Sequence, residues 1–258
     1  MSVLGEGAGS VKPRAVAAAI PGAVGERTAP RARTTETTQA SATHAPPEGT
    51  AAWAEWVKDY YRAIETYDWV EVSDHLRGPE AIFHKNRERV VRKLVSRYAR
   101  PDAPILDAGC GTGLNLRHLP SGSIGLDINP RNIAIVRSRV PGCSAVLGDI
   151  ESMPFSDASF GTVVCTEVLE HIPKPAKALD EIERVLQPEG VLIGSVPAHS
   201  WIWRLRFLST TCPRDEPFHN EYTLEQVREM LGQFQIVHIG YSLLHFNVMF
   251  VARRPTGT

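Results

Sequence analysis

Three alternating glycines follow a short apolar run in the sequence Ile105-Leu106-Asp107-Ala108-Gly109-Cys110-Gly111-Thr112-Gly113. The apolar run is typical of a buried strand, Asp107 lies near its end, and the glycines lead into a predicted helix. In an open α/β sheet, ligands bind at the carboxyl ends of the strands. Glycine has no Cβ, so the backbone can approach a ligand closely. The stretch therefore predicts a ligand-binding turn at the edge of a sheet.

The spacing of these glycines favours a cationic ligand over a dinucleotide. A dinucleotide fingerprint has the spacing G-x-G-x-x-G, but position 114 is Leu114 and the pattern here is G-x-G-x-G. The carboxylate of Asp107 is unfavourable beside a pyrophosphate, whereas a ligand that carries an ammonium and a sulfonium group tolerates it.

Two further carboxylates come at the ends of the next two predicted strands. Asp127 lies twenty positions after Asp107, and Asp149 follows the third strand, directly before Ile150. A carboxylate at Asp127 can accept hydrogen bonds from both hydroxyls of a ribose. One at Asp149 can accept the exocyclic amine of adenine, with Ile150 against the ring. Acids at three successive strand ends therefore predict a cofactor that contains adenosine.

From Pro101 onward, predicted strands and helices alternate, which is typical of a parallel sheet with crossover helices. Helices are expected to begin near Pro130 and Pro175, the second ending at Leu186, and Thr223 is expected to cap a helix to Leu231. The predicted strands are Ile105–Ala108, Ser123–Asp127, Ala145–Gly148, Gly161–Cys165, Gly190–Val196, Gln235–Gly240 and Val248–Arg253. The fold class predicted is α/β: a Rossmann-like, doubly wound, mostly parallel sheet with a C-terminal antiparallel hairpin and added N-terminal helices.

The chain begins with a segment of different composition. Residues 1–50 contain no Phe, Trp or Tyr, so they cannot bury enough apolar surface to offset the entropy of ordering, and we interpret them as a disordered tail. Residues 51–100 are expected to form a helical cap. It includes a long helix from about Glu80 to Tyr98, whose predicted apolar face holds Ile82, Val90, Val91, Leu94 and Val95. Residues 101–258 are the predicted cofactor-binding domain, with residues 199–222 as a substrate lid.

The glycine turn is the first of several motifs that occur in a fixed order. They are ILDAGCGTG at 105–113, Asp127, GDIESMPFSDASFGTVV at 148–164, TEVLEHI at 166–172 and LDEIERVLQPEGVLIGSVP at 179–197. Together they resemble the class I S-adenosylmethionine-dependent methyltransferases, within the broad group that includes ubiquinone/menaquinone and natural-product methyltransferases. The resemblance covers about residues 102–252, and it implies methyl transfer with S-adenosyl-L-methionine as the cofactor.

The resemblance also implies which residues hold that cofactor. It assigns the methionine part to Asp107 and to a turn that contains Gly109, Cys110, Gly111 and Gly113. It assigns ribose and adenine to Asp127 and Ile128, adenine to Asp149 and Ile150, and a place beside the methionine to Thr166.

His171 is the candidate catalytic residue, because it follows the fourth strand, where an acceptor would approach the sulfur. An imidazole can take a proton from a hydroxyl or ammonium acceptor. The alternative is that His171 only fixes the loop before Pro173. Further acceptor-side candidates are His199 and the segment His219–Thr223, for which packing and helix capping are the alternatives. The aromatic and arginine side chains of Trp201–Phe207 could cover the acceptor or touch a membrane surface.

Composition bounds the partners and the location. The chain has 258 residues and a formal net charge of -1, so its average surface does not attract a polyanion, and no nucleic-acid partner is expected. Its four cysteines form no CxxC pair, and no metal site is predicted. No apolar run reaches the ~18 residues that span a bilayer. We therefore expect a cytoplasmic enzyme.

A small-molecule acceptor is predicted, in secondary-metabolite, quinone or lipid-linked biosynthesis. O-, N- and C-methylation stay open. The alternatives are an RNA or protein methyltransferase and a non-catalytic binding protein on the same fold. The sequence predicts no oligomeric state.

Overall fold

A seven-stranded sheet forms the centre of the computed structural model, which describes residues 45–65, 67–75, 80–200, 216–242 and 245–256. The strands are β1 (Ile105–Ala108), β2 (Ile124–Asp127), β3 (Ser144–Leu147), β4 (Phe160–Thr166), β5 (Leu186–Pro197), β6 (Gln235–Tyr241) and β7 (Asn247–Arg253). Their order is β3-β2-β1-β4-β5-β7-β6. The first five run parallel, and β7 is antiparallel to both β5 and β6.

The sheet has its switch point between β1 and β4. The chain moves outward from β1 through β2 to β3, then returns to pair β4 with the other side of β1. Loops that leave β1 and β4 in opposite directions open a crevice at the carboxyl ends of these strands, where ligands bind in doubly wound folds. The predicted fold class is confirmed.

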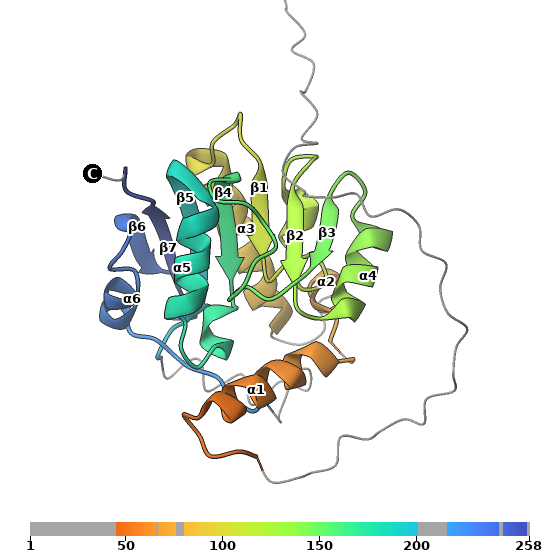
Figure 1. Ribbon diagram of the computed structural model, residues 1–258. Helices are drawn as coiled ribbons and strands as arrows, with labels where there is room; N and C mark the ends of the chain where they lie inside the picture. The colour runs from red at the N-terminus through yellow and green to blue at the C-terminus, as the bar shows by residue number, and fades with distance from the viewer. Residues whose placement is uncertain (1–44, 66, 76–79, 201–215, 243–244, 257–258) are drawn as a thin grey trace, which may run out of the picture.

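Helices cover both faces of the sheet (Figure 1). Helix α5 (Ala176–Val185) and α6 (Leu224–Met230) pack on one face, and α3 (Glu80–Tyr98) and α4 (Pro130–Arg139) pack on the other. Every residue of β4 is buried, as expected for a central strand with apolar layers on both sides. Helices α1 (Ala51–Ala63) and α2 (Trp69–Asp74) complete the described part, and α1 crosses below the carboxyl edge of the sheet in Figure 1.

Capping residues explain where several helices begin. The side chain of Thr223 accepts a hydrogen bond from the backbone of Gln226, and the Gln226 side chain accepts one from Thr223 N, so the predicted cap of α6 is a complete capping box. Pro130 is the first residue of α4 as predicted, and Asn129 caps it. Thr50 is the N-cap of α1, because its hydroxyl accepts a hydrogen bond from Trp53 N at 3.1 Å.

Three local expectations were wrong. The glycine turn leads to a short 3-10 helix, η1 (Leu116–His118), because Pro120 follows too soon for a longer helix. Ile82 is 61% exposed, since at 100° per residue it lies half a turn from the buried Val91. The fifth strand already begins at Leu186, which pairs with Phe160. The other strand ends differ from prediction by one residue or none.

Part of the sequence prediction lies outside the described residues. This holds for residues 1–44 of the predicted tail and for residues 201–215 of the predicted lid. Among the described helices, none is both long and apolar enough to cross a membrane.

Candidate active site

A cavity of about 180 Å³ lies at the carboxyl ends of β1, β2 and β3, next to α1. Of the predicted cofactor residues, it is lined by Gly109, Gly111, Asp127, Ile128, Asp149 and Ile150. Helix α1 contributes Val57, Lys58 and Tyr61 to the opposite wall. The strand-end residues that the sequence placed in one site are thus brought together around one cavity.

Asp127 connects the end of β2 to the glycine turn. One carboxylate oxygen accepts from Gly111 N at 2.8 Å, and the other accepts from Asn129 N at 2.8 Å and from Asn132 Nδ2 at 3.1 Å. Burial raises the pKa of Asp127, and these hydrogen bonds work against that rise. The carboxylate is therefore fixed in direction while one side of it faces the cavity.

Asp149 forms an ion pair with Lys58 of α1, a residue to which no sequence motif pointed. Lys58 Nζ donates to Asp149 Oδ2 at 2.7 Å and also pairs with Glu151, while Glu151 N donates to Asp149 Oδ1 at 2.9 Å. Lys58 therefore ties α1 to the end of β3. A carboxylate has about four lone-pair positions, so Asp149 can still accept a further donor. The contact joins residues 91 positions apart, and helical periodicity gives no signal for it.

The glycines of the turn have left-handed backbones. Gly109 and Gly111 have φ of 77° and 52°. A Cβ on Gly109 would overlap the side chain of Val168, and one on Gly111 would lie 3.0 Å from Trp69. Gly113 has a φ of 94° and packs against Val140. It lines neither this cavity nor an adjoining second one that Cys110 and Thr166 line.

Asp107 lies directly beneath the turn and is 1% exposed. It lines neither cavity, and its Oδ2 has no hydrogen-bond partner among the described residues. Burial, followed by the charge of Asp127, raises the pKa of Asp107 to about 7. A buried carboxylate in this state is stabilised by a nearby cation, and a cofactor with ammonium and sulfonium groups fits that requirement.

A second cavity of about 130 Å³ adjoins the first. Cys110 and Thr166 line it, as do Phe83, His84 and Arg87 of α3. The two cavities share a wall made of Trp69, Gly109, Gly111, Glu167, His171 and Glu216.

Glu167, in this shared wall, has an unusual backbone conformation. Its φ is 53°, in the left-handed region that costs a non-glycine residue about 1–2 kcal/mol. Several contacts hold it there: its carboxylate accepts from Ser195 Oγ at 2.6 Å and from Asn247 Nδ2 at 2.9 Å, and Arg87 lies 3.4 Å away. Strain of this kind, held by surrounding contacts, is common at functional sites.

His171 ends η2 (Leu169–His171) and lies between the two cavities. Its Nδ1 is 2.8 Å from the hydroxyl of Tyr61, which donates to the carbonyl of Phe218 at 3.0 Å. Next to it in sequence, Glu170 is fully buried, and burial together with the charge of Glu167 raises its pKa. The candidate catalytic histidine is thus oriented by α1, an element that carried no transferable motif.

Of the other acceptor-side candidates, His219 lies at a cavity and His199 does not. His219 lines the second cavity, close to the ring of His171, whereas the side chain of His199 is 67% exposed and pairs with Glu221. The segment Trp201–Phe207 lies outside the described residues.

The fold and these cavities define a Rossmann-like protein with a cofactor-type site at its switch point. Comparison with known proteins agrees: residues 106–194 match the family described as a methyltransferase domain. A "probable S-adenosylmethionine-dependent methyltransferase" of Mycolicibacterium smegmatis is 32% identical over 156 residues, 59% of this chain and 58% of the relative. The 24-methylenesterol C-methyltransferase 2 of Oryza sativa is 30% identical over 190 residues, 67% of this chain and 48% of the relative.

Among solved structures, the magnesium protoporphyrin IX methyltransferase of Synechocystis with bound S-adenosylhomocysteine has a TM-score of 0.57 at 17% identity. The match covers 78% of this chain and 99% of that one. The chain carries a class I S-adenosylmethionine-dependent methyltransferase domain, and S-adenosyl-L-methionine is the cofactor of that domain. It spans about half the length of the two curated relatives.

Proposed function

We propose that this protein transfers a methyl group from S-adenosyl-L-methionine to a small-molecule acceptor. The observation that carries the proposal is the pair of adjoining cavities. One is lined by the strand-end acids Asp127 and Asp149, and the other by aromatic and titratable side chains such as Phe83 and His219. The two cavities meet at shared lining residues, so donor and acceptor can lie next to each other where the cavities join.

In this proposal the first cavity holds the adenosine part of the cofactor. The carboxylate of Asp127 accepts hydrogen bonds from the ribose hydroxyls, and Ile128 lies beside the adenine. The carboxylate of Asp149 accepts a hydrogen bond from the adenine amine, and Ile150 packs against the ring. Gly109 and Gly111 of the turn contact the charged methionine part, Asp107 beneath the turn stabilises its charge, and Cys110 and Thr166 lie beside it. Gly113, which packs against Val140, keeps the turn in shape.

S-adenosylmethionine supplies an electrophilic methyl group, so the protein mainly has to align the acceptor and exclude water. Trp69 and Phe83 provide apolar surface for that purpose. His171, in the wall between the cavities, is our candidate for the group that acts on the acceptor. The alternative stays that His171 only shapes its loop.

The names of the similar proteins support a small-molecule acceptor. One is named for a sterol and another for magnesium protoporphyrin. The balanced composition, with a formal net charge of -1, does not favour a nucleic-acid substrate. A cytoplasmic location is part of the same proposal.

The test is a product screen. The purified protein is incubated with metabolite extracts and S-adenosylmethionine that carries an isotope-labelled methyl group, and products are found by mass spectrometry. The D127A variant is the matched control. A labelled small molecule that forms only with the parent protein supports the proposal. Label in RNA or protein alone contradicts it, and so does an absence of label in a protein that binds S-adenosylhomocysteine, which would point to a binding protein.

A further inference from the structure

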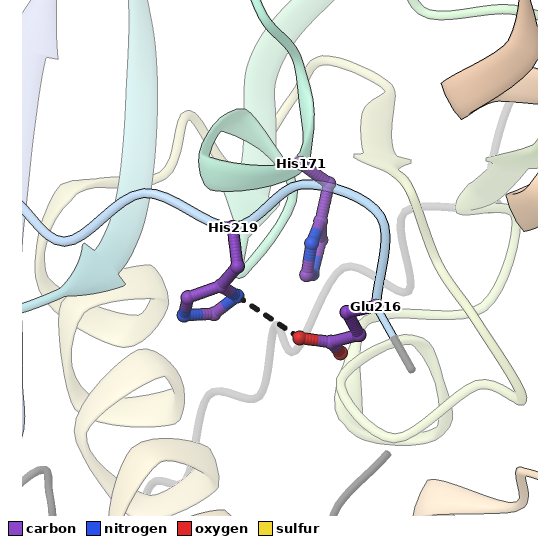
Figure 2. A group of neighbouring side chains, drawn as sticks. All are labelled: His171, Glu216 and His219. Carbon is purple, nitrogen blue, oxygen red and sulfur yellow. Dashed lines mark ion pairs between the residues drawn. The ribbon is translucent and has the colours of Figure 1, made fainter. Parts of the chain in front are cut away.

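His171, Glu216 and His219 bring their ligand-forming atoms within 4.8 Å of one another. Figure 2 shows the three side chains directed toward a common space, with an ion pair of 3.3 Å between His219 Nδ1 and Glu216 Oε2. The imidazole rings of His171 and His219 have centroids 5.3 Å apart. The three residues come from two chain segments, since His171 follows β4 and the other two precede α6.

From this arrangement we propose that the three residues bind one divalent transition-metal cation, such as Zn²⁺, Co²⁺ or Fe²⁺. Two imidazoles and one carboxylate suit these borderline ions better than Mg²⁺ or Ca²⁺, which prefer oxygen ligands. Ligand atoms around a tetrahedral Zn²⁺ at ~2.1 Å lie about 3.4 Å apart. His219 Nδ1 and Glu216 Oε2 already have that separation, at 3.3 Å. Since no pair of ligand atoms is more than 4.8 Å apart, the remaining separations have to shorten by at most about 1.4 Å.

The segment that carries two of the ligands is attached to the rest of the site. Asn220 N donates to Glu170 O at 3.0 Å, and Tyr222 N donates to Pro197 O at 2.9 Å. Phe218 lies between Glu216 and His219 in the sequence. Its ring packs edge-to-face with Trp53 of α1, with ring centroids 5.2 Å apart. The positions of Glu216 and His219 relative to His171 are thus fixed by backbone hydrogen bonds on one side and by an aromatic contact on the other.

Tyr61 provides a hydrogen-bond partner for the ring nitrogen of His171 that would not bind the metal. The Tyr61 hydroxyl has one hydrogen and lies 3.0 Å from Phe218 O and 2.8 Å from His171 Nδ1. Both contacts are hydrogen bonds when the hydroxyl donates to Phe218 O and the ring Nδ1–H of His171 donates to the hydroxyl oxygen. That tautomer leaves the lone pair of His171 on Nε2. Histidine ligands almost always donate their other N–H in this way, which orients the ring toward the ion.

The site lies where an acceptor would meet the methyl group. Glu216 and His171 line both cavities, and His219 lines the second. Each of the three side chains keeps between 13% and 22% of its surface exposed, so ions and ligands can reach them. Three protein ligands leave a coordination position open. An oxygen or nitrogen atom of the acceptor can occupy that position, which is the part of this inference that rests on the proposed function.

The test uses Co²⁺ and Zn²⁺ alone, added to the full chain after removal of any purification tag and treatment with a chelator. We expect binding of one ion per chain in calorimetry, visible d–d absorption with Co²⁺, and a higher melting temperature with Zn²⁺. H171A, E216Q and H219A should each weaken Co²⁺ binding at least tenfold, and Y61F should weaken it by about tenfold. H238A removes an exposed histidine of β6 and is the matched control with unchanged binding.

The melting temperature of each variant without metal shows whether it folds, and E216Q keeps the shape of the side chain should the histidine variants not fold. Failure of the parent chain to bind Co²⁺, or equal binding by folded E216Q, overturns the site. These measurements use neither acceptor nor S-adenosylmethionine, so their failure leaves the proposed methyl transfer untouched. Once the acceptor is known, kcat separates the two roles of His171. A metal site predicts comparable losses in H171A, H219A and E216Q, whereas a proton-accepting His171 predicts a loss in H171A alone.

Discussion

The carboxylate of Asp127 bridges β2, the glycine turn and the cavity, so its loss should affect any ligand that contains the ribose. We expect D127A to bind S-adenosylmethionine and S-adenosylhomocysteine alike about ten- to a hundredfold more weakly, which corresponds to about 1.5–3 kcal/mol. Isothermal titration calorimetry measures both affinities. Asp127 also accepts Gly111 N and Asn129 N, so the melting temperature has to be compared as well.

A matched control for D127A is D102A, because Asp102 is exposed in the turn before β1. D102A should keep both affinities. If D127A binds both ligands as tightly as the parent protein, Asp127 is not a ribose ligand.

Asp107 predicts a proton linked to cofactor binding. Its pKa is about 7 in the folded protein and 3.8 in a solvated chain. Below pH 7 the free protein therefore holds a proton on Asp107, and a cation bound nearby favours its release. Affinity for S-adenosylmethionine should rise as the pH increases to about 7 and then level off. Calorimetry at pH 6 in buffers of different ionisation enthalpy should show release of up to one proton.

The same raised pKa has a consequence for stability. Between about pH 4 and pH 7 the folded state binds a proton that the unfolded state does not, so the Asp107 contribution to the free energy of unfolding falls as the pH rises through this range. D107N carries no titrating group and should lose both the proton release and this part of the pH dependence. Proton release that persists in D107N would assign it to another group.

Helix α1 forms one wall of the first cavity. Lys58 binds Asp149 and Glu151 at the end of β3, and Asn129 Nδ2 donates to the carbonyls of Tyr61 and Ile64. Since these contacts join α1 to the cavity wall, a bound ligand should stabilise the helix. We expect S-adenosylhomocysteine to slow the hydrogen exchange of amides in Ala51–Ala63.

Helix α6 provides the internal reference for that measurement, because none of its residues lines either cavity. Exchange in α6 should change less than exchange in α1. K58A should reduce the protection of α1 and weaken ligand binding by a few-fold, as expected for a half-buried ion pair. Equal exchange rates in α1 with and without ligand would show that the helix does not close over it.

At the scale of the whole molecule, our interpretation of residues 1–44 as part of a disordered tail is testable by truncation. Residues 1–44 contain no aromatic residue, so we expect their deletion to leave the melting temperature and the affinity for S-adenosylhomocysteine unchanged. Deletion of residues 1–50 also removes Thr50, the cap of α1. Loss of such a cap costs about 1 kcal/mol, or roughly 2–4 °C in melting temperature.

Thermal denaturation of the two truncated chains decides the point, with T50A in the full chain as the control for the cap alone. T50A and the longer truncation should show similar losses. A fall of several degrees in the chain that lacks only residues 1–44 would contradict our interpretation of this segment.

Much of the fold, and the strand-end residues that line the first cavity, could be predicted from the sequence, because their signals are local. Apolar runs that end in Asp107, Asp127 and Asp149 mark strands and their carboxyl ends within a few residues, and parallel strands bring these ends to one edge. Pro130 and Thr223 likewise mark where their helices begin, Pro130 as the first residue of α4 and Thr223 as the N-cap of α6. Ile82 shows the limit of such reasoning, since its exposure depends on which side of α3 meets the sheet.

The rest of the candidate site depends on contacts between distant segments. Lys58 meets Asp149 across 91 positions and Tyr61 meets His171 across 110. Glu216 lies near His171 in a segment that is hydrogen-bonded to Glu170 through Asn220. No periodicity or spacing encodes such pairs, since they follow from how α1 and the segment before α6 pack over the carboxyl edge of the sheet. The sequence by itself thus determined the sheet and the acids at its strand ends, and the tertiary packing alone decided which residues surround the second cavity.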